Sequence, residues 1–238
     1  MNRQGNTYTV IYSVLLVLIV GIVLSLVYQA LRPTQEENIA NDTKKQILAA
    51  ARIVPENGES VSSLYERHIL KSYIVNSKGE VIDNKKPAFA VNVSAQIKLP
   101  DNQRELPVFE CKTADGIKYI LPVYGAGLWG PIWGYVAFDN NGNTIYGAYF
   151  AHQGETPGLG AEIEKPAFSS QFDGKKIFNS QGLYSPIAII KAGQNPGDKE
   201  YVNAVSGGTI TSHGVQVMLD NSLAPYSEFL KKVGHESE

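Results

Sequence analysis

The sequence contains a single cysteine, Cys111, among its 238 residues. One cysteine excludes an intramolecular disulfide framework and any metal site built from several cysteines. The chain also lacks a basic excess, because 21 Lys and Arg stand against 23 Asp and Glu, and this balance argues against a nucleic-acid binder. With 22 Gly and 12 Pro, it has too little of either for a fibrous or low-complexity protein. One sizeable folded domain, or two small ones, is therefore expected.

Charge is absent from the whole interval between Gln4 and Ala30. Within it, residues 10–28 form an almost entirely apolar run, and a helix of about 20 such residues crosses the hydrocarbon core of a bilayer. The sequence therefore predicts a transmembrane anchor. The alternative is a cleaved signal peptide, but its apolar region is shorter, about 7–15 residues, and residues 27–30 make a poor cleavage site.

Basic residues do not decide the orientation of this helix, because Arg3 precedes it while Arg32 and two lysines follow it. The predicted organisation is a tail and anchor at 1–32 and a soluble domain at 33–238. The first part of that domain, 33–55, is predicted to be a helical stalk, because residues 34–51 are polar with a thin apolar stripe.

The rest of the chain predicts an α+β fold. From Phe109 onward, short runs rich in Tyr, Ile and Val are separated by Gly- and Asn-containing turns, a pattern typical of an antiparallel meander. Helices are expected to pack on this mainly antiparallel sheet. The expected helices are 60–70, 161–171, 212–219 and 226–233, the further strands are 72–75 and 186–191, and 85–106 is expected to be a loop or an inserted strand pair.

Residues 206–212, Ser-Gly-Gly-Thr-Ile-Thr-Ser, are the first segment that suggests chemistry. Two glycines permit a tight turn, hydroxyl groups follow, and a helix is expected to begin near Ser212. The backbone N–H groups at a helix start attract phosphate. The alternative is a glycine turn followed by a Ser or Thr helix cap, and the segment lacks the lysine of a P-loop.

Two other segments combine glycine with functional side chains. Residues 155–160, Glu-Thr-Pro-Gly-Leu-Gly, place a carboxylate and a hydroxyl on a rigid turn, although an ordinary loop is the simpler interpretation. Residues 124–134 contain both tryptophans among glycines, which suits a flat ring ligand or packing at the sheet. The four histidines are not spaced as a metal-binding pair, so neither a metal site nor a catalytic residue is predicted.

Together with the anchor, these segments make the chain resemble the C subunit family of the sodium-translocating NADH:quinone reductase. The related G subunit of Rnf-type ferredoxin:NAD complexes has a similar flavin-binding domain. The family attaches FMN to the threonine of an Asp-x-x-Ser-Gly-Ala-Thr pattern. The matching string here runs from Asn203 to Thr209, with Asn203 in place of the aspartate and Gly208 in place of the alanine.

The resemblance implies that a flavin transferase links the Thr209 hydroxyl covalently to the phosphate of FMN, with Thr211 as a competing acceptor. Backbone amides after Ser206 would bind the phosphate. Lys191 would pair with the phosphate or the ribityl chain, unless it is only a solvated strand end, and Glu155 would orient its own turn. The full predicted cofactor set is Ser206, Gly207, Gly208, Thr209, Ile210, Thr211, Leu128, Trp129, Glu155, Thr156, Leu159, Gly160 and Lys191.

The same resemblance implies how the flavin ring would be held. The Thr156 hydroxyl and nearby backbone would hydrogen-bond the ring edge, and Leu128, Trp129 and Leu159 would pack on its faces. The chain would then carry electrons between redox centres of partner subunits in a sodium-transporting oxidoreductase that uses NADH and ubiquinone. It would not oxidise NADH alone, because it has no dinucleotide-binding fingerprint.

The family resemblance also implies a place in the cell: a single pass through the inner membrane, with a cytoplasmic N-terminus and a periplasmic domain. Three alternatives stay open. The first is an Rnf-type G subunit, and the second is a membrane-anchored scaffold that keeps the fold without flavin. The third is an exported FMN-binding reductase domain. Asn203 is the feature that favours the scaffold, because it removes a charge from the attachment pattern.

Overall fold

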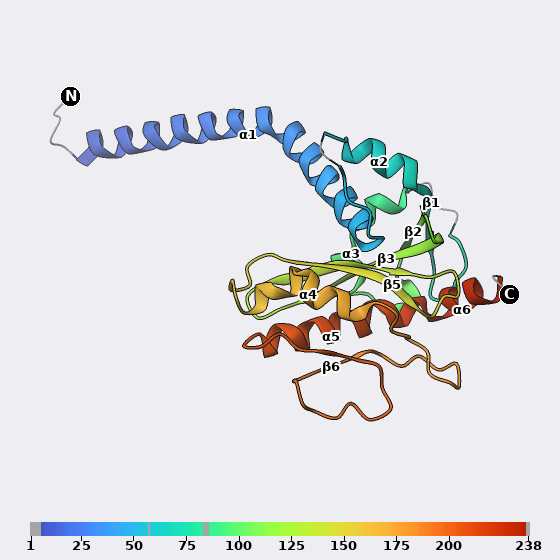
Figure 1. Cartoon of the computed structure of the whole chain (residues 1–238). Coiled ribbons are helices and arrows are strands. Elements are labelled where there is room, and N and C mark those ends of the chain that lie inside the picture. The colour runs from blue at the N-terminus through green and yellow to red at the C-terminus, as the bar shows by residue number, and fades with distance from the viewer. Residues whose placement is uncertain (1–5, 57, 83–85, 237–238) are drawn as a thin grey trace. The chain divides into compact units, whose positions relative to one another are not determined.

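A computed structural model describes residues 6–56, 58–82 and 86–236 (Figure 1). The chain divides into two compact units, Met1–Thr43 and Lys44–Glu238. The first unit is formed by most of helix α1 (Asn6–Ala50), which is long and apolar enough to cross a membrane. Its most apolar part buries nothing within the protein, as expected of a helix whose surroundings are lipid.

The second unit is built on one five-stranded sheet, whose strands follow their order in the chain and pair antiparallel throughout. The predicted meander is confirmed, and one more strand precedes it. Its strands are β1 (Ile69–Val75), β2 (Leu106–Thr113), β3 (Gly116–Ala126), β4 (Pro131–Phe138) and β5 (Ile145–His152).

The segment expected at 85–106 is a loop rather than an inserted strand pair over residues 86–105, and Leu106 is the first residue of β2. Pro87 and Pro100 precede short helical turns there, consistent with the proline ring, which removes a strand hydrogen bond. Helix α2 (Val61–His68) leads directly into β1. The short helices of the loop are η1 (Ala88–Ala90), α3 (Val93–Gln96) and η2 (Asp101–Gln103).

The helix expected at 161–171 is three short pieces, because Pro166 has no N–H and interrupts the helical hydrogen bonds. The pieces are η3 (Gly160–Glu164), α4 (Pro166–Ser169) and η4 (Ser170–Phe172). The expected strand at 186–191 is β6 (Ala188–Ile190), which pairs parallel with β7 (Tyr201–Asn203). The pattern did not predict β7, since only Val202 of its three residues is buried.

The first C-terminal helix begins earlier than the sequence pattern indicated. Helix α5 (Thr209–Leu223) starts three residues before Ser212, and η5 (Ala224–Tyr226) joins it to α6 (Ser227–Glu236), which starts one residue after the expected position. The earlier start of α5 makes Thr209 the first residue of the helix.

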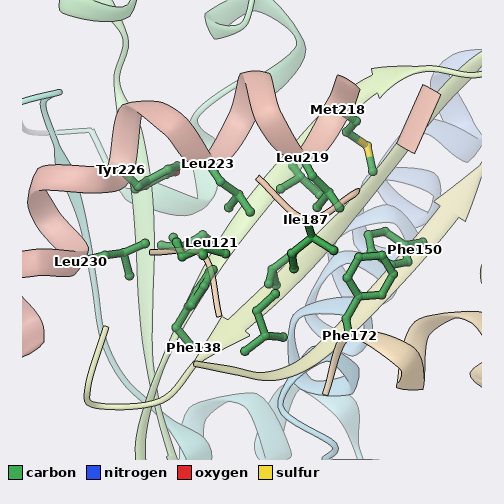
Figure 2. Packing of buried hydrophobic residues seen from close by; sticks show 14 of the residues in the cluster. Leu121, Phe138, Phe150, Phe172, Ile187, Met218, Leu219, Leu223, Tyr226 and Leu230 are labelled. Atoms are coloured by element: carbon green, nitrogen blue, oxygen red, sulfur yellow. The ribbon is translucent and has the colours of Figure 1, made fainter. Parts of the chain in front are cut away.

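Hydrophobic packing covers both faces of the sheet, because successive strand residues point to opposite sides. In β3, Leu121 joins the core under the C-terminal helices, and its neighbour Ile120 joins the core on the other face. Figure 2 shows Met218 and Leu223 of α5 above Leu121 in the first of these cores. The second core contains Ile47 and Ala50 from the last turns of α1, and Ala51 directly after the helix.

The turn between β4 and β5 packs closely on α6, and Gly142 makes that possible. Its φ of 63° lies in the left-handed region, and a Cβ there would clash with the carbonyl oxygen of Leu230. Gly174 has a similar φ of 75°, yet no atom lies within 4 Å of its Cβ position. The two glycines therefore share the conformational requirement and differ in the space available.

We predict that Gly142→Ala destabilises the fold more than Gly174→Ala. Gly174→Ala should cost about 1 kcal/mol through its left-handed backbone alone. Gly142→Ala should cost about 1–3 kcal/mol beyond that, because helix α6 must shift. Denaturant unfolding of the purified full-length chain in detergent measures the difference. Equal losses for the two variants would contradict the close packing of this turn against α6.

Cys111 lies in β2 and is fully buried. Burial raises the pKa of its thiol to about 12. Because the thiolate is the reactive form, a raised pKa lowers reactivity at any pH below it. We predict that iodoacetamide alkylates Cys111 at pH 8 at least ~100-fold more slowly in the native protein than in urea. Similar native and denatured rates, followed by mass spectrometry, would contradict this burial.

Candidate functional site

Glu155 joins three segments that are far apart in the sequence. Its carboxylate is buried, with 4% of the residue exposed. Oε1 accepts a hydrogen bond from the backbone N–H of Trp129 at 2.8 Å, and Oε2 accepts one from the Thr211 hydroxyl at 2.5 Å. One carboxylate thus ties the loop after β3 and the loop after β5 to the first turn of α5.

Two glycines make room for this carboxylate. A Cβ at Gly127 would clash with Oε1 of Glu155, and a Cβ at Gly160 would clash with Oε2 and with the Thr211 hydroxyl. The backbone therefore approaches both carboxylate oxygens more closely than any larger residue permits. Gly127 was not among the predicted site residues, although it lies in the glycine-rich segment that the sequence analysis singled out.

Helix α5 begins from a tight turn. Gly208 donates its N–H to the carbonyl of Val205 at 3.0 Å, and Gly207 within this turn has a φ of 74°. Gly208 is the residue before the helix, and its carbonyl accepts from the N–H of Ser212 at 2.8 Å. The bond from Ser212 to Gly208 is the first hydrogen bond of the helix. The N–H groups of residues 209–211 therefore have no acceptor within the helix and point out of its start.

The two threonines of this segment have different surroundings. Thr209 is exposed, at the first position of α5. Thr211 is only 2% exposed, and its hydroxyl donates to Glu155. Ser212 is fully buried, and its hydroxyl accepts from the N–H of Val205 at 2.9 Å. Thr209 is therefore the threonine whose hydroxyl an external reagent reaches.

Large apolar side chains are exposed on the same three segments. Trp129 and Ile210 are 69% and 59% exposed, and Leu128 and Leu159 are close to half exposed. Leu159 lies against the turn before α5, because its Cδ2 is 2.6 Å from the Cβ position of Gly207. Exposed apolar groups gathered around an open helix start are typical of a binding surface.

Trp133 differs from Trp129, although the two lie in the same sequence segment. Trp133 is half-buried in β4, and its Nε1–H donates to Oε1 of Gln46 at 3.0 Å. It therefore packs against the last turns of α1, on the opposite side of the strand from its buried neighbour Ile132. Of the two tryptophans, Trp129 presents the free ring.

Thr156, Lys191 and Asn203 are connected to the start of α5 less closely than Glu155 is. The Thr156 side chain is exposed, and its carbonyl accepts from the N–H groups of Leu159 and Ala161 at 3.1 Å each. Lys191 follows β6 and is exposed, and in the described part of the chain no hydrogen bond or ion pair joins its side chain to residues around Thr209. Asn203 ends β7, where its backbone N–H donates to Gln171 at 2.8 Å.

Sequence reasoning also missed the support of Glu155 by β5. Nδ1 of His152 accepts the N–H of Glu155 at 3.2 Å, and Oε1 of Glu164 accepts the N–H of His152 at 3.3 Å. Since these contacts depend on the local path of the backbone, residue spacing carried no signal for them. Within residues 6–56, 58–82 and 86–236, no cluster of His, Cys, Asp and Glu is suited to hold a metal ion.

The geometry fits a flat ligand that carries a phosphate group. Backbone N–H groups at the start of α5 suit the phosphate, and the exposed rings and aliphatic groups suit a planar apolar surface. Thr209 is exposed at the same helix start. The site therefore combines anion recognition and ring packing on segments that Glu155 joins.

Comparison with known proteins agrees with this arrangement. A family model described as an FMN-binding domain matches residues 127–224, which include segments 155–160 and 206–212 and residues 127–134 of the third segment. The C subunit of the Na(+)-translocating NADH-quinone reductase from Vibrio vulnificus is 34% identical, with 91% of each chain covered. The corresponding subunit from Neisseria meningitidis is 31% identical, and the comparison covers 98% of this chain and 97% of that one.

Solved structures give the same result for the fold. The C subunit from Parabacteroides distasonis superposes with a TM-score of 0.77 at 44% identity, over 84% of this chain and 96% of that one. The C subunit from Shewanella oneidensis gives a TM-score of 0.68 at 26% identity, over 82% of this chain and 98% of that one. The chain therefore belongs to the C subunit family of the Na(+)-translocating NADH-quinone reductase.

Proposed function

We propose that this chain carries FMN, bound covalently through its phosphate to Thr209, and passes electrons between redox centres of partner subunits in a sodium-translocating NADH:quinone reductase. The observation that supports this proposal most is the contrast between the two threonines. Thr209 is exposed at the helix start, whereas the Thr211 hydroxyl is buried and donates to Glu155. The competing attachment site is thus already occupied by an internal hydrogen bond.

The residues around Thr209 fit each part of FMN. The N–H groups of residues 209–211 would bind the phosphate, and esterification at Thr209 would keep its remaining negative charge at the positive end of α5. Ser206 and the two glycines shape the turn that exposes this helix start. Lys191 would add a positive charge on the phosphate or ribityl side.

The exposed apolar residues would hold the isoalloxazine ring. Trp129, Leu128 and Leu159 would pack on its faces, and the Thr156 hydroxyl would donate to its edge. When bound, the flavin supplies the electron-transfer chemistry, and the chain supplies the tether, the orientation and the electrostatic surroundings. Ile210, which is 59% exposed, would cover the ring on the helix side.

The chain would act only within a larger assembly. Its relatives are named as subunits of a reductase. A flavin transferase would form the bond between FMN and Thr209. The span carries no charged residue between Gln4 and Ala30, so this helix alone provides no polar path for sodium. NADH oxidation and sodium movement would therefore belong to partner subunits.

The proposed topology is a single pass through the inner membrane. Residues 1–32 would form the tail and anchor, with the N-terminus in the cytoplasm, and residues 33–238 would form the periplasmic domain, with 33–55 as its stalk. The apolar helix α1 supports the membrane crossing, and the family resemblance supports its direction.

A membrane-anchored scaffold without flavin is the second candidate function. Asn203 supports it, because the attachment pattern of the family has an aspartate at this position. Asn203 lies at the end of β7, beside a pocket of about 160 Å³ that Lys165 and Gln171 also line. Loss of a carboxylate there would change how a flavin transferase recognises the segment.

We predict that Thr209→Ala abolishes covalent flavin, because it removes the only exposed threonine hydroxyl at the start of α5. The full-length chain is produced in cells that also contain a flavin transferase. Flavin fluorescence of the denatured protein band on a gel then reports covalent attachment. The wild-type band should fluoresce, and the Thr209→Ala band should be dark while the protein amount is unchanged.

Thr211→Val is the matched control, because it removes the other hydroxyl and keeps the side-chain shape. Its band should stay fluorescent, although loss of the hydrogen bond to Glu155 should cost about 1–3 kcal/mol of stability. A dark wild-type band, with the transferase active on another target, would favour the scaffold. A fluorescent Thr209→Ala band together with a dark Thr211→Val band would show that the flavin is attached to Thr211 and not to Thr209.

The topology generates a separate prediction. Alkaline phosphatase fused to the C-terminus of the full chain should be active, because this enzyme folds only after export, and green fluorescent protein at the same position should be dark. Activity of the two reporters in cells measures which side holds the domain. The reverse pattern would place the domain in the cytoplasm and overturn the proposed orientation.

A further inference from the structure

Glu155 is a buried carboxylate whose hydrogen-bond partners are all neutral. Its oxygens accept from the Trp129 backbone at 2.8 Å and from the Thr211 hydroxyl at 2.5 Å. Across the described residues, no Lys, Arg or His side chain forms an ion pair with it. The negative charge is therefore held in place by hydrogen bonds and is not cancelled by a cation.

Lys118 shows how this chain treats another buried charge. It is 3% exposed, and its Nζ lies 2.6 Å from Oδ1 of Asp139, so its charge is balanced by a direct partner. Glu155 has a weaker form of compensation, because its Oε2 contacts a side chain in the first turn of α5, where the helix dipole is positive. A hydrogen-bonded carboxylate at a helix start stays stable without a counter-ion.

The position of this charge relates it to the proposed cofactor. Glu155 hydrogen-bonds the backbone of Trp129, whose ring would pack on the flavin, and the side chain of Thr211, two residues from the proposed attachment point. Unit charges within about 10 Å of one another interact appreciably at the effective dielectric constant of a protein surface. The charge of Glu155 would therefore repel negative charge that the flavin gains on reduction.

We infer that Glu155 is a positioning residue that also lowers the reduction potential of the flavin at this site. The inference rests on the proposed function. Its carboxylate fixes the loop of Trp129 against the start of α5, and its charge disfavours the more negative, reduced form of the cofactor. The close approach of Gly127 and Gly160 keeps the carboxylate in this one place.

Glu155→Gln separates the charge from the positioning. Glutamine has almost the same size and keeps one acceptor oxygen, but it carries no charge. The full-length flavinylated chain in detergent is titrated between oxidised and reduced forms while its absorbance is recorded. At the midpoint potential of the wild type, the ratio of reduced to oxidised flavin should be at least about threefold higher in Glu155→Gln.

Two further variants show whether the effect comes from charge. Glu200→Gln removes a carboxylate whose side chain is 39% exposed and pairs with Lys175, and water should screen its loss, so the ratio should be unchanged. Thr211→Val removes a donor to Glu155 and keeps the charge. It should not raise the reduced fraction, because Glu155 keeps its charge.

The outcomes separate this inference from the proposed function. Wild-type protein without covalent flavin would overturn both. Flavinylated wild type with an unchanged ratio in Glu155→Gln would overturn the inference alone. A rise in the reduced fraction of Thr211→Val equal to that of Glu155→Gln would also overturn it, because the shift would then follow from displaced loops rather than from charge.

Discussion

The arrangement of the site depends on the two hydrogen bonds of the Glu155 carboxylate. Trp129, Glu155 and Thr211 lie in two loops and a helix start that are far apart in the sequence, so local sequence does not link them. A carboxylate that accepts from a backbone N–H and from a hydroxyl fixes both distance and direction. Because these bonds are buried, breaking one leaves a polar group without compensation, so the loops behave as one unit.

This constraint also sorts the hydroxyl groups at the start of α5. Thr211 and Ser212 point into the protein and are used in internal hydrogen bonds, whereas Thr209 precedes them on the exposed side. The helix period places residues two positions apart on opposite sides of the helix axis. The buried hydroxyl of Thr211 and the exposed Thr209 therefore lie within the same turn. Helix geometry thus gives two chemically identical threonines different exposure.

The sequence predicted the features that follow from local patterns. The charge-free run identified the apolar helix, and the turns at residues 113–116 and 139–143 identified the meander, because both signals are strong over short distances. Pro166 breaks the helix expected at 161–171, because its ring removes a backbone N–H. Strand β7 was missed because one buried valine between two exposed residues gives no alternating run. The contact between Glu155 and Thr211, 56 residues apart, had no local signal, and only the family resemblance brought the two segments together.

The last turns of α1 decide where the chain tolerates being cut. Ile47, Leu48 and Ala50 are fully buried, and the Gln46 side chain accepts from Trp133. A Cβ at Gly147 would lie 2.5 Å from the carbonyl oxygen of Ala50, so this end of the helix is fitted to β5 as closely as an internal element. A soluble fragment that starts beyond Ala51 would expose the underside of the sheet and aggregate through it, whereas one that starts before Lys44 retains a complete core. The apolar segment of α1 and the folded domain therefore share one helix, and the boundary between them lies inside it.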